Sequence, residues 1–176
     1  MNKSEIARWI YGTSHITGRF KLRSGQLSKE YFDKYLFEAE PKLLAEIAGF
    51  MLPLIPPWVD ILAGLEMGGI PVASALSLYS GVPAAFVRKK AKEYGTCKLA
   101  EGPDVKDKNV CIVEDIVTTG GQIIESAREL RKRGAKIDAA MCVILRDEKA
   151  VSLLAAEGLT LIPAFTMDYI KEQSLR

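Results

Sequence analysis

The sequence has little that would tie the protein to a membrane or to nucleic acid. Its net charge is only +2 over 176 residues, and the two most apolar stretches, 43–62 and 63–87, are interrupted by acidic residues, prolines and glycines. A membrane-spanning helix needs about 20 consecutive, mostly apolar residues, so neither stretch predicts one. The near-neutral charge gives no electrostatic drive toward nucleic acid. We therefore expect a soluble protein that binds neither membranes nor nucleic acid.

Cysteine and several well-known motifs are also scarce or missing. The three cysteines, Cys97, Cys111 and Cys142, are an odd number at wide spacing, which fits neither a disulfide framework nor a metal site and favours a reducing compartment. The polar first residues do not resemble a secretory signal, so we expect a cytoplasmic location. The chain lacks the lysine of a P-loop and the GxGxxG fingerprint, which argues against a P-loop-like kinase and a dinucleotide enzyme.

What remains is the composition of an ordinary globular domain, with 48% apolar and 26% charged residues. The chain length predicts one domain over residues 1–176. Hydrophobic periodicity predicts strands at 19–22, 59–63, 84–87, 110–113, 137–145 and 159–162, and helices at 4–11, 41–52, 72–79, 121–132, 149–156 and 167–172. Because strands and helices alternate, we expect an α/β fold with an open, mostly parallel twisted sheet and helices on both faces. The turn-rich stretch 12–18 holds the only histidine, His15, for which we expect a structural role.

The most informative stretch is 110–121, which reads Val-Cys-Ile-Val-Glu-Asp-Ile-Val-Thr-Thr-Gly-Gly. Its first residues predict a buried strand that ends at the carboxylates of Glu114 and Asp115, and residues 116–121 then turn into a helix. Such a turn presents backbone N–H groups, hydroxyls and a helix N-terminus to a phosphate. Paired carboxylates beside it can accept hydrogen bonds from vicinal hydroxyls. The stretch therefore predicts a site for a phosphorylated sugar.

Two further stretches follow predicted strands and should reach the same edge of the sheet. Residues 64–71, Gly-Leu-Glu-Met-Gly-Gly-Ile-Pro, form a glycine-rich turn that a ligand can approach closely. Residues 88–98 carry five basic residues and one acidic residue, and glycines at 95 and 102 could act as hinges. We interpret this basic segment as a lid that supplies positive charge to a leaving group.

Stretch 110–121 resembles the phosphoribosyl pyrophosphate (PRPP) signature of type I phosphoribosyltransferases. Residues 20–33, with Phe20, Leu22 to Gly25, Ser28 and Tyr31 to Asp33, are similar to the amino-terminal hood of orotate phosphoribosyltransferases, and Arg-Lys-x-x-Lys-x-Tyr-Gly at 88–95 is similar to their catalytic loop. This resemblance implies that residues 1–40 cover the base site. It also implies a homodimer in which the loop 88–102 completes the partner's site.

The resemblance implies a set of roles, each carried over by position. Contacts to PRPP fall on Arg88, Lys89, Lys92, Tyr94, Glu114, Asp115, Ile116, Val117, Thr118, Thr119, Gly120 and Gly121, and the pyrophosphate loop is Glu66, Met67, Gly68 and Gly69. Contacts to orotate fall on Arg23, Tyr31, Phe32, Thr118 and Arg146. The catalytic residues implied are Glu114, Asp115, Lys89 and Lys92, with Mg²⁺ held through PRPP oxygens rather than directly by the protein. Tyr94 stands where well-studied relatives have histidine, and a tyrosine is not a cation near neutral pH.

The implied reaction is Mg²⁺-dependent transfer of the phosphoribosyl group from PRPP to orotate, which forms orotidine 5′-monophosphate and pyrophosphate in pyrimidine biosynthesis. Two alternatives remain open at this point. One is a phosphoribosyltransferase for another nucleobase. The other is a non-catalytic regulator that senses PRPP, although a sensor has no leaving group for the basic segment to stabilise.

Overall fold

A six-stranded, mostly parallel sheet forms the centre of the protein. The computed structural model describes residues 1–21, 25–90 and 98–175. The strands of the sheet are β3 (Ile61–Leu65), β4 (Ala84–Val87), β5 (Ala100–Glu101), β6 (Asn109–Val117), β7 (Lys136–Leu145) and β8 (Thr160–Thr166), in the order β5-β4-β3-β6-β7-β8. Only the β4–β5 pair is antiparallel. The predicted α/β class with a mostly parallel sheet is therefore confirmed.

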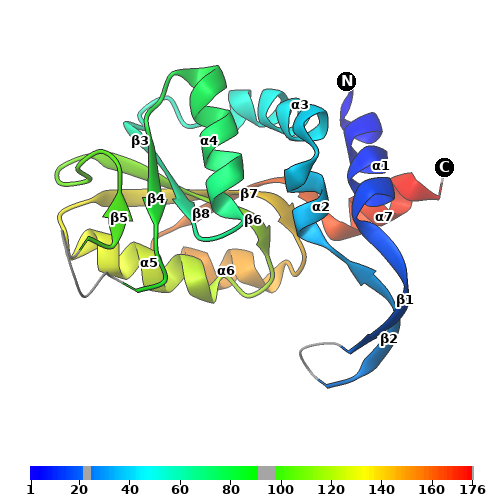
Figure 1. Cartoon of the computed structure of the whole chain (residues 1–176). Helices are drawn as coiled ribbons and strands as arrows, with labels where there is room; N and C mark the ends of the chain where they lie inside the picture. Colours follow the sequence, from blue (N-terminus) through cyan, green and yellow to red (C-terminus); the bar gives the residue numbers. More distant parts are fainter. Residues whose placement is uncertain (22–24, 91–97, 176) are drawn as a thin grey trace.

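Helices cover both faces of this sheet (Figure 1). They are α1 (Lys3–Ser14), α2 (Lys34–Ala39), α3 (Pro41–Met51), α4 (Gly69–Ser80), α5 (Gly121–Arg131), α6 (Lys149–Ala155) and α7 (Met167–Ser174), with a short 3-10 turn, η1 (Leu52–Leu54), after α3. Helices α3 and α4 lie on one face, together with α1, α2 and α7 at its end, whereas α5 and α6 lie on the other. None of the helices within the described ranges is both long and apolar enough to cross a membrane.

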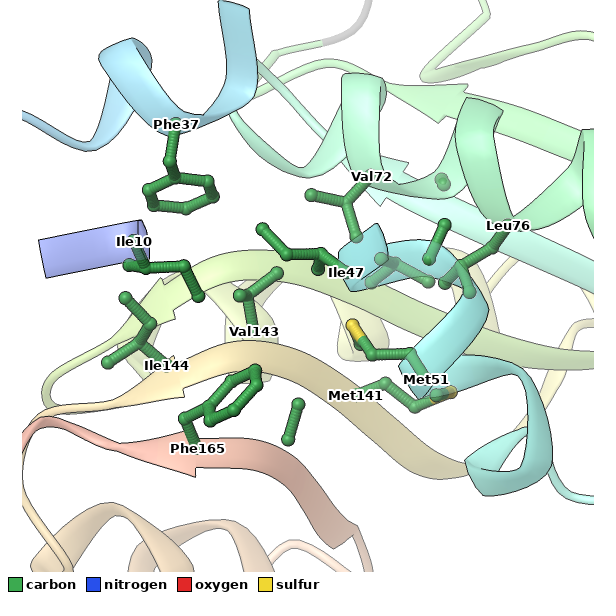
Figure 2. Packing of buried hydrophobic residues seen from close by; sticks show 14 of the residues in the cluster. Ile10, Phe37, Ile47, Met51, Val72, Leu76, Met141, Val143, Ile144 and Phe165 are labelled. Carbon is green, nitrogen blue, oxygen red and sulfur yellow. The ribbon is translucent and has the colours of Figure 1, made fainter. Parts of the chain in front are cut away.

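The core on the α3–α4 face joins the amino-terminal helices to the sheet. Figure 2 shows Ile10 of α1 and Phe37 of α2 above Val143 of β7, with Phe165 of β8 close by. All four side chains are almost fully buried. Burying an apolar side chain of this size contributes about 1.5–3 kcal/mol, so this cluster fixes α1 and α2 against the sheet. The acidic pair on β6 is therefore covered by a helix that the core holds in place.

The amino-terminal segment differs from its prediction around the histidine. The prediction of a turn-rich connection at 12–18 is wrong, because α1 continues to Ser14 and His15 begins a strand. Strand β1 (His15–Lys21) pairs with β2 (Leu27–Phe32) in an antiparallel hairpin that projects from the main body (Figure 1). His15 stacks on Tyr11 at 4.6 Å between ring centroids, and its Nε2 lies 2.8 Å from Glu30. These contacts place the histidine at the base of the hairpin.

The central strand also runs further than predicted. Glu114 and Asp115 lie inside β6 rather than at its end, and α5 begins only at Gly121. The reason is the neighbouring strand: Ile116 and Val117 pair with Ile144 and Leu145 of β7, and the β-branched side chains of Ile116, Val117 and Ile144 suit that pairing. The predicted bounds of the strand after α3 are also shifted, from 59–63 to Ile61–Leu65.

Close packing of α4 on β3 predicts that an added methyl group at Gly64 is destabilising. A β-carbon there would lie 2.6 Å from the carbonyl oxygen of Gly69 and 2.8 Å from Cβ of Ala73. Gly64→Ala should therefore lower the free energy of unfolding by about 1–3 kcal/mol, as other overpacked cores do. Gly49→Ala is the matched control, because nothing lies within 4 Å of its added β-carbon. In the helix interior that alanine should be stabilising by about 1 kcal/mol. If urea denaturation gave the same change in the free energy of unfolding for Gly64→Ala and Gly49→Ala, the result would contradict this packing.

Candidate functional site

A cleft opens where β6 meets α5, at the carboxyl ends of the parallel strands. Its volume is about 360 Å³, and it is lined by Lys34, Tyr35, Glu66, Met67, Lys89, Glu114, Ile116, Val117, Thr118, Thr119, Gly120, Gly121, Gln122 and Ile123. Gly120 has a φ of +76°, which lets the chain turn sharply from strand into helix. The N-terminus of α5 and two threonine hydroxyls therefore face a hollow that can hold an anion.

The glycine-rich turn after β3 forms the opposite wall of this cleft. Glu66 joins it to two neighbouring elements, since its Oε1 accepts a hydrogen bond from the amide of Lys89 at 2.5 Å and its carbonyl accepts one from Nε2 of Gln122 at 3.0 Å. The Glu66–Met67 peptide bond is cis. The four predicted pyrophosphate residues thus lie between Lys89 and the start of α5, although Gly68 and Gly69 are buried and do not line the cleft.

The two acids of β6 have different surroundings. Glu114 is 7% exposed and lines the cleft, whereas Asp115 is fully buried beneath the turn at Gly68. Asp115 is not in an apolar environment, however. Its Oδ2 lies 2.5 Å from Nζ of Lys34 on α2, and its Oδ1 accepts a hydrogen bond from the amide of Ile116 at 2.5 Å. The structure therefore brings the predicted acidic pair to the cleft, with one member inside it and the other behind it.

A third carboxyl, Glu38 of α2, completes a buried acidic cluster. Burial, together with the neighbouring Asp115, raises the pKa of Glu38 to about 9, and the same two causes raise the pKa of Glu114 to about 9. Burial opposes ionisation of Asp115 too, but hydrogen bonding to Glu38 and Glu114 and the charge of Lys34 keep its pKa below the usual value. Asp115 is thus the ionised member of the cluster, with Lys34 as its counter-ion.

Of the predicted basic segment, Arg88 and Lys89 lie within the described residues. Lys89 lines the cleft, while Nε of Arg88 lies 3.4 Å from Glu101 on β5. Lys92 and Tyr94 fall outside the described residues, and so does Arg23 of the hairpin. Their predicted roles stay predictions.

The predicted base-binding residues line two cavities that adjoin the cleft. Tyr31, Phe32 and Arg146 line a cavity of about 390 Å³ between the β1–β2 hairpin and α7. Arg146 also lines a cavity of about 450 Å³, which it shares with Thr118. Thr118 in turn belongs to the cleft at α5. The three hollows are therefore neighbours that share the lining residues Thr118 and Arg146, so that a flat base and a phosphorylated sugar could be held side by side.

Sequence reasoning missed three residues of this site. Lys34 and Glu38 lie on α2, a helix of six residues that was not predicted because its segment reads as a run of aromatics. A signal was available: Asp33 is a typical N-cap, and its side chain accepts a hydrogen bond from the amide of Tyr35. A lysine and a glutamate four residues apart after such a cap would share one helix face. No comparable signal pointed to Gln122.

Comparison with known proteins identifies the family. Residues 37–162 match the model of the phosphoribosyl transferase domain. The orotate phosphoribosyltransferase of Nocardioides sp. is 50% identical over 161 residues, which cover 92% of this chain and 90% of that protein. The chain belongs to the orotate phosphoribosyltransferase family. The family member from Methanocella arvoryzae is 42% identical over 88% of this chain and 89% of its own.

Solved structures of orotate phosphoribosyltransferases have the same fold. The Mycobacterium tuberculosis enzyme in complex with Fe(III) dicitrate aligns with a TM-score of 0.86 and 29% identity, over 96% of this chain and 98% of that one. The same enzyme in complex with PRPP aligns with a TM-score of 0.81 and 27% identity over the same shares. The family assignment thus agrees with the resemblance that the sequence motifs predicted. It rests on sequence and fold similarity and does not depend on the geometry of the cleft.

The ion pair beneath the turn predicts a pH-dependent loss of stability in Lys34→Met. Removing one partner of a buried pair costs about 3–5 kcal/mol, and the partial exposure of Lys34 should reduce this to about 2–3 kcal/mol at pH 7. Asp115 has a lowered pKa, so its contribution to stability is present above the ordinary value of 3.8 and is lost as the pH falls through its pKa in the folded protein. The deficit of the variant should therefore shrink in acid.

Chemical denaturation of the wild type and of Lys34→Met, from about pH 8 down to about pH 3, measures this deficit, because the range begins well above 3.8 and ends below it. Lys42→Met is the matched control, because Lys42 is an exposed lysine of the next helix and its replacement should change stability by less than about 0.5 kcal/mol. A deficit that stays constant with pH would contradict the ion pair.

Proposed function

We propose that this protein transfers the 5-phosphoribosyl group of PRPP to orotate, forming orotidine 5′-monophosphate and releasing pyrophosphate. The observation that carries the proposal is that the three hollows are neighbours: Thr118 lines both the cleft of the PRPP signature and one cavity of Arg146, and Arg146 lines the second cavity as well. The family assignment supports the same reaction. This reaction supplies the precursor of uridine monophosphate in pyrimidine biosynthesis.

We assign the sugar phosphate to the turn between β6 and α5. The amides of this turn, the hydroxyls of Thr118 and Thr119 and the positive end of α5 would hold the 5-phosphate. Glu114 lines the cleft and is the carboxyl that ribose hydroxyls would reach, whereas Asp115 behind it supplies fixed negative charge. That charge favours the positive charge that develops at the anomeric carbon as the bond to pyrophosphate breaks.

We assign the pyrophosphate to the space between the glycine-rich turn and Lys89. Glu66 fixes the backbone of Lys89 beside this turn, and Lys89 lines the cleft. Mg²⁺ bound to pyrophosphate oxygens would neutralise part of the charge of the leaving group. No three histidine, cysteine, aspartate or glutamate residues within the described ranges form a metal-binding group. In this proposal the ion would be held through substrate oxygens, in the cleft that Glu66 and Glu114 line.

We assign orotate to the cavities on either side of Arg146. The guanidinium group of Arg146 suits a bidentate contact with the carboxylate of orotate, and Tyr31 and Phe32 would frame the flat ring. Lys171 lines the same cavity and adds a second positive charge. A cytoplasmic location, a homodimer and a hood formed by residues 1–40 remain predictions.

The direct test is the fall in orotate absorbance with PRPP and Mg²⁺, with uracil, xanthine and adenine run in parallel. Orotate should be consumed, and equimolar pyrophosphate should appear. Consumption of another base in place of orotate would overturn the assignment of the base. PRPP binding without turnover of any base would instead favour a regulator that senses PRPP.

Lys89→Ala tests the pyrophosphate site. Loss of a positive charge that acts mainly on the departing group should lower kcat about 100-fold or more, while the KM for orotate changes little. Lys90→Ala is the matched control, since Lys90 is exposed and does not line the cleft. Activity of Lys89→Ala within about twofold of the wild type would show that this lysine does not touch the leaving group.

Arg146→Ala tests the base site. Loss of a charged hydrogen-bonding partner should raise the KM for orotate by roughly 10- to 100-fold and leave the KM for PRPP nearly unchanged. Arg133→Ala, at the far end of α5 where Arg133 pairs with Glu129, should leave both constants unchanged. An equal rise of both constants in Arg146→Ala would remove the reason for assigning the orotate carboxylate to this arginine.

A further inference from the structure

Glu38 is a buried acid to which the proposed reaction assigns no role. It lies on α2 and is only 8% exposed. Its Oε1 has no hydrogen-bond partner among the described residues. The neighbouring Oδ2 of Asp115 is contacted by Nζ of Lys34. Buried polar atoms nearly always have a partner, so an unpartnered carboxyl oxygen beside a buried carboxylate requires an explanation.

These two oxygens meet beneath the turn at Gly68. A β-carbon added to Gly68 would overlap the carboxylate of Asp115 and would lie 2.8 Å from Oε1 of Glu38. Both oxygens therefore lie close to a single point, and the glycine closes over them because it has no side chain. Lone pairs of two carboxyl groups thus face each other in a region closed to solvent.

One proton between the two groups resolves this contact. Two ionised carboxylates at short distance in a buried region repel each other strongly, whereas a carboxylic acid and a carboxylate form a short, strong hydrogen bond. Asp115 is the better anion of the two, because it has Lys34 beside its Oδ2 and accepts a hydrogen bond from the amide of Ile116. Oε1 of Glu38 has no such donor among the described residues, so the proton belongs on Glu38.

The groups that face Glu38 agree with this assignment. Asp115 and Glu114 on β6 are acidic, and Lys34 on its own helix is the only basic group that acts on it within the described part of the chain. Burial and the two acids favour the neutral form, and the lysine, which is bound to Asp115, opposes them only in part. Glu114 is the competing site for a proton, since it has the same acidic neighbour.

We propose that Glu38 is a carboxylic acid at neutral pH, that it donates a hydrogen bond to Oδ2 of Asp115, and that it is thereby a positioning residue for the acidic pair of the PRPP site. The hydrogen bond holds Asp115 in the orientation that leaves Glu114 free to face the cleft. The statement about the proton is independent of the reaction, whereas the positioning role rests on the proposed function.

Difference infrared spectroscopy of the substrate-free protein at neutral pH tests the proton. The wild type should show carbonyl stretching absorption of protonated carboxylic acids. Glu38→Gln should lose the component of Glu38, with the component of Glu114 remaining, while it keeps the circular dichroism spectrum of the folded protein. Glu125→Gln, which changes an exposed acid of α5, should retain both components. Loss of absorption in Glu114→Gln but not in Glu38→Gln would overturn the proposal. An unchanged spectrum in Glu38→Gln would also overturn it, because Glu38 would then be ionised or separated from Asp115 by water.

The pH profile of kcat/KM for PRPP tests the positioning role. The wild type should lose activity as the pH rises through about 9, where Glu38 gives up its proton and repels Asp115. Glu38→Gln keeps an N–H donor that cannot ionise, so its activity at neutral pH should stay within about threefold and its alkaline limb should move to higher pH. Glu38→Ala should lose about tenfold or more at every pH.

Two outcomes separate the assignment of the proton to Glu38 from the claims about positioning and about the reaction. An alkaline limb of Glu38→Gln identical with that of the wild type would contradict the positioning role, even if the infrared band assigns the proton to Glu38. A protein that shows this band but consumes no orotate would contradict the proposed function and leave the proton assignment standing.

Discussion

The structure of the site depends on one buried interaction, the contact of Asp115 with Lys34 and Glu38 behind the central strand. A carboxylate with no exposure to solvent is costly unless positive charge and hydrogen-bond donors surround it. The fold meets this cost by packing α2 over the carboxyl end of β6, with Phe37 in the core and Lys34 above the acid. The segment that carries the hairpin is thereby fixed to the strand that carries Glu114 and Asp115.

This arrangement explains why substrate-binding groups from distant parts of the sequence share one edge of the sheet. Parallel strands bring the turn after β3, the start of the basic segment after β4 and the turn after β6 to the same side. The hairpin and α7 then close the space around Arg146, so the base cavity adjoins the phosphate cleft through Thr118. In the proposed reaction the charge is divided accordingly, with Lys89 assigned to the departing group and the acids of β6 assigned to the ribose.

Much of the fold and of the candidate site could be predicted from the sequence, because the motifs that indicate them are short, contiguous stretches. Strand β4 was predicted with its observed bounds, and the acids, threonines and glycines of 114–121 are contiguous and carry their chemistry in their order. The length of β6 could not be read, because it depends on pairing of Ile116 and Val117 with a strand almost thirty residues later. The roles of Lys34 and Glu38 were missed for a similar reason. Their helix is too short to show periodicity. Their role depends on contact with Asp115, which is distant in the sequence and is brought close only by the fold.

The central claim is that PRPP docks where β6 turns into α5, and a titration of backbone amide chemical shifts tests it most directly. Addition of PRPP with Mg²⁺ to isotopically labelled protein should shift the amide signals of residues 118–121 first and most, followed by those of the turn at 66–69. Shifts confined to the opposite end of α5, near Arg133 and Gly134, with residues 118–121 unmoved, would contradict the account.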